Sequence, residues 1–186
     1  RITKYAKEFG LGDKSGIEIP ESAPKIATEF PVMAAIGQSN NAYSTVQLSR
    51  YITSIANNGK VYNLTLLDKT TSGKDTLLKD YAPVIKHELS FLTPDSWNAI
   101  HSGLRMVVEK LATFNTVVTP VAGKTGTAQE DKTRPSHALF VGYAPFEQPT
   151  FSIATRIAFG YTSGNAAEVS ALITKYFFKE ADRSTL

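Results

Sequence analysis

The sequence predicts an α+β fold, in which helices pack on one face of an antiparallel sheet. Apolar residues recur at helical spacing in four segments, and three strand-like stretches follow one another between residues 121 and 158. The chain has 186 residues, 42% of them hydrophobic, which suffices for the core of one ordinary domain. We therefore expect one domain, or most of one.

The first helix is expected at residues 1–9, where Ile2, Tyr5, Ala6 and Phe9 share one face. A chain whose first residue, Arg1, already lies in a helix is expected to be part of a longer protein.

The clearest helix signal begins at Ser44, because Ser44 and Gln47 have the S-x-x-Q spacing of a capping box. Residues 57–59, Asn-Asn-Gly, tolerate a left-handed backbone and should end this helix. The apolar stripe between these signals is Leu48, Tyr51, Ile52 and Ile55.

Two further helices are expected after it. Thr93 as cap and Pro94 in the first turn begin one of them. Its expected buried residues are Trp97, Ile100, Leu104, Val107, Val108 and Leu111. The last helix covers about residues 166–178, with an expected inward face of Val169, Leu172, Ile173, Tyr176 and Phe177.

Between these two helices lie three expected strands, at about residues 121–129, 138–143 and 150–158. Short polar or Pro-containing connections join them, which predicts an antiparallel meander. The charged run from Glu130 to Arg134 is expected to be a solvated hairpin connection. Residues 67–80 are rich in Lys, Thr, Ser, Gly and Asp and predict a surface hairpin or loop.

Composition narrows the classes of function. The net charge of +3 comes from scattered lysines and arginines, so we expect no nucleic-acid partner. The absence of cysteine excludes disulfides, thiolate catalysis and cysteine-based metal sites. No apolar run reaches the roughly 20 residues of a membrane span, so any anchor or export signal is expected outside this segment.

The three histidines have no spacing that indicates a metal site. His101 is expected to be a surface residue of its helix. His137 opens a predicted strand, where a structural role or a role at the rim of a site is expected.

The sharpest local signal is Lys124-Thr125-Gly126-Thr127, within the first predicted strand of the meander. A lysine and a threonine hydroxyl together can hold a carboxylate by charge-assisted hydrogen bonds. Gly126 leaves space for an extended peptide to pair with the strand, and the N–H beyond it is placed to stabilise a tetrahedral oxyanion. The alternative is an ordinary edge strand that ends in Thr and Gly.

Lys124-Thr125-Gly126 resembles the third motif of serine penicillin-binding proteins and β-lactamases. Its flanks resemble class B, monofunctional penicillin-binding proteins over nearly the whole chain. The segments that carry the resemblance are Phe9-Gly10-Leu11-Gly12, Ser15-Gly16-Ile17-Glu18-Ile19-Pro20-Glu21, Ile36-Gly37-Gln38, Gln47-Leu48, Ala56-Asn57-Asn58-Gly59, His137-Ala138-Leu139-Phe140-Val141-Gly142-Tyr143-Ala144-Pro145 and Asn165-Ala166-Ala167. Residues 1–186 are accordingly expected to be the C-terminal part of a single transpeptidase domain, with the β-lactamase/transpeptidase-like fold.

The resemblance implies a peptidoglycan D,D-transpeptidase, which cross-links stem peptides through an acyl-serine and is acylated by β-lactam antibiotics. It implies no metal and no organic cofactor. In this role Lys124 would organise the charge around the serine hydroxyl. Thr125 and Thr127 would bind the substrate carboxylate, the Thr127 N–H would complete the oxyanion hole, and Gly126 would make room. The parent protein would be anchored at the extracytoplasmic face of the bacterial membrane.

The same family order places the nucleophilic serine–lysine pair and the Ser-x-Asn motif upstream of Arg1, so the upstream part of the domain is an expected partner. The chain has one S-x-x-K match at Ser22, but Pro24 stands between its serine and lysine. It has one Ser-x-Asn match at Ser39, in the expected Ile-Gly-Gln turn. We expect neither serine to be the nucleophile.

Two departures from the family pattern do not touch catalytic positions. Ser39 stands where the family usually has Gly, and Thr45-Val46-Gln47 replaces Thr-Pro-Leu-Gln with altered spacing. Ala128-Gln129 and the strand after it favour the elongation-type, cell-shape enzymes. The alternatives are a serine β-lactamase or β-lactam-sensor domain, and a fragment that is inactive by itself and has a structural or interaction role.

Overall fold

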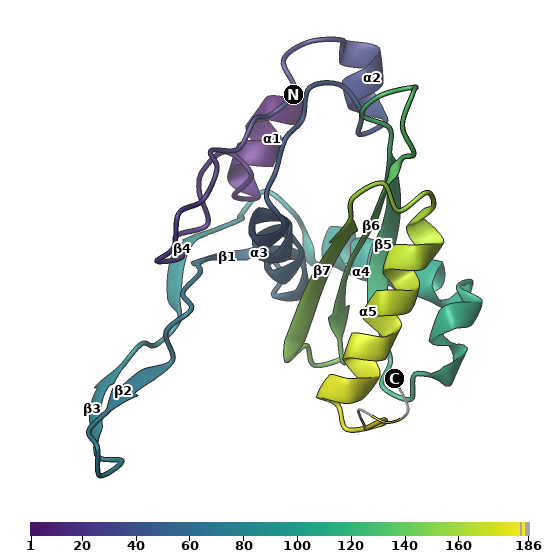
Figure 1. Cartoon of the computed structure of the whole chain (residues 1–186). Helices are drawn as coiled ribbons and strands as arrows, with labels where there is room; N and C mark the ends of the chain where they lie inside the picture. The colour runs from purple at the N-terminus through teal and green to yellow at the C-terminus, as the bar shows by residue number, and fades with distance from the viewer. Residues whose placement is uncertain (183, 185–186) are drawn as a thin grey trace.

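The computed structural model describes residues 1–182 and 184. Figure 1 shows a sheet formed by β5, β6 and β7 with helices around it, an N-terminal part that carries α1 and α2, and a thin hairpin that projects away from the body. Within the described residues, no helix combines the length and the apolar character needed to cross a membrane.

The sheet has the order β5-β6-β7 and is antiparallel throughout. Its strands are β5 (Ala122–Ala128), β6 (His137–Ala144) and β7 (Phe151–Ile157). Gly142 in β6 lies opposite Gly123 in β5 and Ile153 in β7. The predicted meander is confirmed, and the outer edges of β5 and β7 have no strand partner among the described residues.

Helices cover both faces of this sheet, so the expectation of helices on one face was wrong (Figure 1). Successive residues of β6 point to opposite faces. Ala138, Phe140 and Ala144 pack in the cluster that includes α5 (Ser163–Phe177). Tyr143 and Val141 pack in the other cluster, beside α3 (Thr45–Ala56) and the first turns of α4 (Pro94–Glu109). An interior strand that is apolar on both faces requires a layer on each side.

The expected inward face of the last helix was also wrong. The residues of α5 that are buried are small: Ala166, Ala167, Ser170, Ala171 and Thr174. The larger Val169, Ile173, Tyr176 and Phe177 are between 37% and 52% exposed. Small side chains let the helix backbone lie close to the sheet. This close packing stabilises α5 more than burial of its larger apolar side chains at a greater distance would.

The capping signals of α3 and α4 are confirmed. Ser44 Oγ accepts a hydrogen bond from the Gln47 N–H at 3.2 Å, and Gln47 Oε1 accepts one from the Ser44 N–H at 2.8 Å. Thr93 Oγ1 accepts a hydrogen bond from the Ser96 N–H at 3.2 Å at the start of α4. After α3 the chain turns at Asn58, whose φ is 53°.

The segment between α3 and α4 forms the projecting hairpin of Figure 1. Two short antiparallel pairs build it: β1 (Lys60–Asn63) with β4 (Val84–Glu88), and β2 (Lys69–Thr71) with β3 (Leu77–Asp80). The hairpin predicted within residues 67–80 is confirmed, whereas the β1–β4 pair was not predicted. After α4, a 3-10 helix η1 (Ala112–Thr116) leads to β5.

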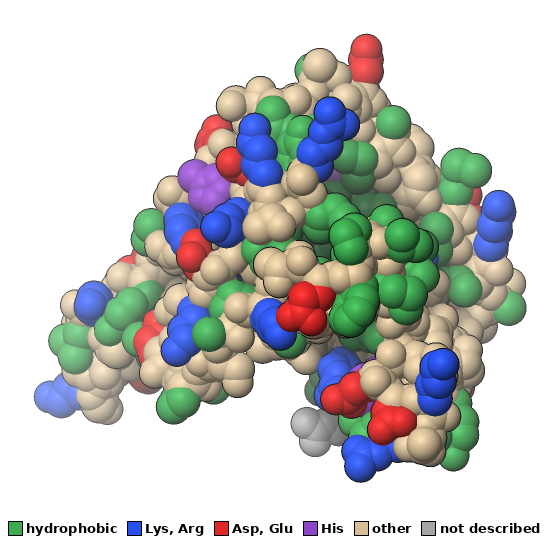
Figure 2. Space-filling view, turned by 90° about the horizontal axis from the view of Figure 1, so that it is seen from above, with side chains coloured by type: hydrophobic (Ala, Val, Ile, Leu, Met, Phe, Trp, Pro, Cys, Tyr) green, Lys and Arg blue, Asp and Glu red, His purple; other side chains and the backbone are tan. Residues whose placement is uncertain are grey.

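The N-terminal part contains α1 (Ile2–Glu8), which confirms the first predicted helix, and the short α2 (Pro31–Ala35), which was not predicted. Neither helix has a buried residue. Figure 2 looks onto this end of the molecule and shows hydrophobic side chains gathered over the middle of the face. Those that α2 and its flanks expose are Phe30, Val32, Met33 and Ile36.

Candidate active site

The predicted site residues Lys124, Thr125, Gly126 and Thr127 all lie on β5, an outer strand of the sheet. One edge of β5 pairs with β6, and the other edge has no strand partner in the described part of the chain. Lys124 and Thr127 are exposed, while Thr125 and Gly126 are half-buried. The fold therefore places the tetrapeptide at an open strand edge.

The backbone groups of Thr125 and Thr127 face this open edge. Residues of a strand direct their N–H and C=O groups alternately to the two edges. The Thr127 carbonyl accepts a hydrogen bond from Gln38 Nε2 at 3.3 Å, and Gln38 lies outside the sheet. The Thr125 carbonyl accepts one from Lys124 Nζ at 2.7 Å. The Thr127 N–H, which has the same direction as its carbonyl, is thus available to a group that lies along the open edge.

The side-chain hydroxyl of Thr127 can donate a hydrogen bond to a ligand. Its Oγ1 accepts a hydrogen bond from the Ser163 N–H at 3.2 Å, at the first turn of α5. Because that oxygen already accepts, its own proton remains free for an anion. The N-terminus of a helix also favours negative charge nearby. Thr127 therefore combines a backbone donor, a side-chain donor and a helix N-terminus at one place.

Lys124 supplies a positive charge from the opposite face of the same strand. Ala122 packs in the cluster of Tyr143, α3 and α4, and Lys124, two residues later, shares that face. Thr125 and Thr127 share the α5 face. No carboxylate of the described residues forms an ion pair with Lys124. Its charge is thus available to an anionic or nucleophilic group beside β5.

The two glycines of β5, Gly123 and Gly126, differ in how much space a side chain would have. A Cβ at Gly123 would lie 2.5 Å from Phe140 Cζ and 2.6 Å from the Val141 carbonyl oxygen, so sheet packing requires glycine there. A Cβ at Gly126 would meet Leu139 at 3.5 Å, an ordinary contact. Packing within the chain therefore does not demand Gly126, and its predicted role of making room for substrate stays a prediction.

Neither local serine match has the geometry of an activated nucleophile. Ser22 lies in irregular backbone, so Ser22 and Lys25 do not share a helical face, as Pro24 predicted. Ser39 has a φ of 80°, a left-handed conformation that favours the glycine usual in the family. Its Oγ donates a hydrogen bond to the Glu29 carbonyl at 2.5 Å. Ser39 is thus engaged in loop structure.

His101 is half-buried, so its expected surface position was wrong. Its Nε2 lies 2.8 Å from Asn58 Oδ1, and its Nδ1 is hydrogen-bonded to the Tyr143 hydroxyl of β6. Burial lowers the pKa of His101, while burial and the charge of Glu147 raise the pKa of Tyr143 to about 12. Both shifts favour the uncharged side chains, and the hydrogen bond of this pair joins α4 to the sheet. Its members are 42 residues apart, so helical periodicity did not reveal it.

His137 is buried at the start of β6 and has a structural role. Its Nε2 lies 2.9 Å from Glu130 Oε2, and its Nδ1 accepts a hydrogen bond from the Phe159 N–H at 3.1 Å. It thereby ties the connection between β5 and β6 to the chain that follows β7. The run from Glu130 to Arg134 is exposed in that connection, as predicted.

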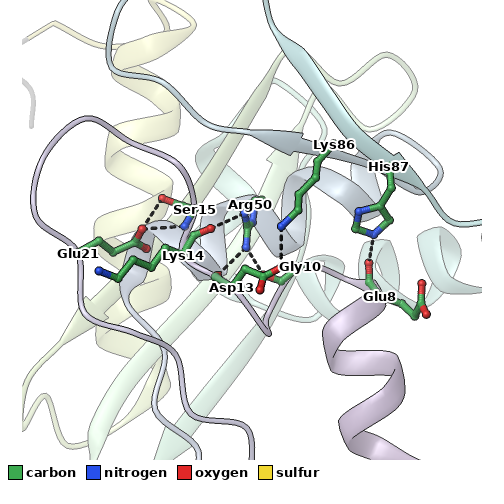
Figure 3. Close-up of polar contacts among 9 residues, drawn as sticks. All are labelled: Glu8, Gly10, Asp13, Lys14, Ser15, Glu21, Arg50, Lys86 and His87. Atoms are coloured by element: carbon green, nitrogen blue, oxygen red, sulfur yellow. Dashed lines mark hydrogen bonds and ion pairs between the residues drawn. The ribbon is translucent and has the colours of Figure 1, made fainter.

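Sequence reasoning missed the buried residue that anchors the N-terminal part, Arg50 of α3. Figure 3 shows its guanidinium donating hydrogen bonds to three backbone carbonyls. The acceptors are Gly10, Asp13 at 2.7 Å and Lys14 at 2.8 Å. The family-like segment from residue 10 onward is thus bound to α3 by one side chain. The only available signal was a lone arginine between apolar helix residues.

Glu21 makes a second polar anchor beside Arg50 (Figure 3). One carboxylate oxygen accepts hydrogen bonds from the Ser15 N–H at 2.7 Å and the Ser15 Oγ at 2.9 Å. The other accepts one from Ser44 Oγ at 2.9 Å. Burial raises the pKa of Glu21, but these hydrogen bonds outweigh it and leave the pKa below its ordinary value.

A hollow lies apart from the tetrapeptide and is lined by side chains from within residues 105–121. Its volume is about 260 Å³, and it lies between the end of α4 and residues 114–121, where Arg105 pairs with Glu109. It does not include Lys124 or Thr127. Within residues 1–182 and 184, no three His, Asp or Glu side chains are grouped to hold a metal ion. The expectation of no cofactor stays a prediction.

Comparisons with known proteins agree on one family. The family described as "penicillin binding protein transpeptidase domain" matches residues 1–178. Penicillin-binding protein 2B of Streptococcus pneumoniae is 26% identical over 195 residues, which covers 91% of this chain and 28% of that protein. Peptidoglycan D,D-transpeptidase MrdA of Haemophilus influenzae is 27% identical over 216 residues, which covers 97% of this chain and 33% of that protein. The chain thus spans a third or less of these curated relatives.

Solved structures have the same fold. Penicillin-binding protein A from Mycobacterium tuberculosis, in an imipenem acyl-enzyme complex, has a TM-score of 0.78 at 19% identity, covering 90% of this chain and 40% of that chain. Penicillin-binding protein 2B from Streptococcus pneumoniae has a TM-score of 0.77 at 20% identity, covering 97% of this chain and 33% of that chain. The predicted α+β, transpeptidase-like fold is confirmed.

Proposed function

The chain belongs to the penicillin-binding protein transpeptidase domain family, and from this premise we propose that it forms one side of the active site of a peptidoglycan D,D-transpeptidase. The observation that carries the proposal is the open edge of β5, with Lys124 on one face and Thr127 on the other. This edge offers what an acyl transfer from an extended, anionic peptide requires: backbone pairing, a positive charge and an oxyanion donor.

In the proposed reaction, a serine hydroxyl attacks the penultimate D-alanyl carbonyl of a stem peptide. A C–O bond forms, the C–N bond breaks, and the leaving D-alanine takes a proton. An amine of a second stem peptide then attacks the ester, forming the cross-link and returning the serine hydroxyl. The Thr127 N–H stabilises the oxyanion in both steps, Thr125 and Thr127 hold the carboxylate, and Gly126 leaves space for the peptide. Lys124 stabilises negative charge as the serine proton departs.

The serine and its lysine would come from residues upstream of this chain. Two surfaces support this partner: the outer edge of β7, which pairs with no other strand of the described residues, and the α5 face that exposes Val169, Ile173 and Tyr176. An exposed apolar helix face and a free strand edge both indicate surfaces that another element covers. Residues 1–186 are accordingly proposed to be the C-terminal part of one transpeptidase domain, inactive without the rest.

The substrates would be peptidoglycan stem peptides, and β-lactams would acylate the same serine. The parent protein is proposed to act at the extracytoplasmic face of the bacterial membrane, anchored by a segment outside this chain. Relatives named as D,D-transpeptidase and the acyl-enzyme structure of a relative support these proposals.

The test is intact-mass analysis of the complete parent protein after incubation with penicillin G. We expect one covalent adduct on one serine, and no adduct on the 186-residue chain alone. Lys124→Ala should slow acylation about a hundredfold, the usual size of effect for one electrostatic group at an active site. Lys132→Ala, at an exposed lysine of the β5–β6 connection, is the matched control. An adduct at Ser22 or Ser39 would contradict the proposed origin of the nucleophile.

A further inference from the structure

Backbone hydrogen bonds join the two ends of the loop that carries α2. Lys25 and Ala42 exchange two backbone hydrogen bonds of 2.7 and 2.8 Å. Above this pair, Asn41 Oδ1 accepts from the Ala27 N–H at 2.8 Å and Asn40 Oδ1 from the Thr28 N–H at 3.2 Å. These hydrogen bonds join the two ends of residues 26–41, here called the α2 loop.

The tip of the α2 loop is loosely packed. α2 has no buried residue, and a Cβ at Gly37 would meet no atom within 4 Å. Gly37 and Ser39, on either side of Gln38, have positive φ values of 81° and 80°. The Gln38 backbone is held in this turn, because its N–H donates to the Met33 carbonyl at 2.9 Å and its carbonyl accepts from Asn41 Nδ2 at 3.0 Å. Only the side chain of Gln38 would therefore need to move to uncover an acceptor that it contacts.

One side chain of this tip contacts β5. Gln38 Nε2 donates to the Thr127 carbonyl at 3.3 Å, on the edge that has no strand partner. In strand addition, an incoming peptide presents an N–H to such a carbonyl. A ligand N–H and the Gln38 side-chain amide would therefore compete to donate a hydrogen bond to the same carbonyl oxygen.

We infer that Gln38 covers the Thr127 carbonyl in the free protein and selects among ligands by whether they offer an amide N–H to replace it. The inference rests on the proposed function. A ligand with such an N–H must displace Gln38, whereas a ligand without one leaves Gln38 in place. Gln38 is thus a specificity-determining residue of the acylation step.

The test compares two antibiotics on the complete parent protein. Penicillin G carries an amide N–H on its side chain, and imipenem carries a hydroxyethyl group there instead. Gln38→Ala should raise the second-order acylation rate constant of penicillin G about two- to tenfold, which corresponds to one neutral hydrogen bond. The rate constant for imipenem should change less than about twofold, since that ligand does not use the acceptor.

Gln38→Met has similar side-chain length without a donor and should behave as Gln38→Ala does. Gln148→Ala, at an exposed glutamine of the β6–β7 connection, should change neither rate. An unchanged or lowered penicillin G rate in both Gln38 variants would overturn the inference while the proposed function stands. A wild-type protein that neither antibiotic acylates would overturn the proposed function, and the inference with it.

Discussion

The sheet with α5 and the N-terminal part of the chain are held in place by different forces. Phe140, Ala144 and Ala167 of the sheet and α5 are buried in an apolar cluster. Residues 1–43 contribute Phe9 to the edge of the other cluster, and residues 10–21 are bound by polar contacts of Arg50 and Glu21. The hydrophobic effect does not depend on the direction of a contact. Hydrogen bonds require a defined distance and angle, so those made to loop backbone fix the conformation of that loop. β5, which carries the proposed site, thus lies on a packed core, whereas residues 10–21 are positioned by polar contacts.

The largest expected effect is on the packed side. Phe140→Ala should lower the free energy of unfolding by about 3–5 kcal/mol, because Phe140 is fully buried and a cavity remains. Phe140 also stacks on Phe114 with ring centroids 5.2 Å apart. Chemical denaturation measures the effect, with the exposed Phe159→Ala as control. A loss no larger than that of the control would show that the core lies elsewhere.

A smaller and more local effect is expected at the polar anchor. Arg50→Met should cost about 2–4 kcal/mol, because three carbonyl groups lose a buried donor. Hydrogen exchange should increase in residues 8–21 more than in β5–β7. Arg105→Met, which removes one hydrogen bond to the Val121 carbonyl and a partly exposed ion pair with Glu109, is the comparison. Uniform loosening of the whole chain would show that the two regions are not separable.

The smallest effect concerns Glu21 and depends on pH. The folded pKa of Glu21 is below the ordinary 4.5, so the unfolded chain binds more protons as the pH falls. The stabilisation is complete above pH 4.5 and is lost as the pH falls through the lower folded pKa. Glu21→Gln should be less stable than wild type at pH 7, with the difference shrinking below pH 4.5. A difference that does not vary with pH would show that the charge of Glu21 is unimportant.

Local signals in the sequence determined much of this protein. Ser44, Thr93 and the apolar residues after them were sufficient for α3 and α4, because caps and helical stripes are local patterns. The three strand-like stretches and the short polar or Pro-containing connections between them were sufficient for the meander. The tetrapeptide and its flanks predicted the family, which the match over residues 1–178 confirms.

Tertiary structure alone decided which faces are buried and which polar groups meet. Periodicity predicted Val169 and Ile173 as the inward face of α5. The small residues of α5 face the sheet instead, because they let the helix backbone approach the strands closely and pack without gaps. Short pairs such as β1 with β4 depend on a distant partner strand. Likewise, Arg50 at Gly10 and Gln38 at Thr127 join residues 40 and 89 positions apart. No local pattern specifies such contacts, because a side-chain donor finds its backbone acceptor only when the fold brings them together.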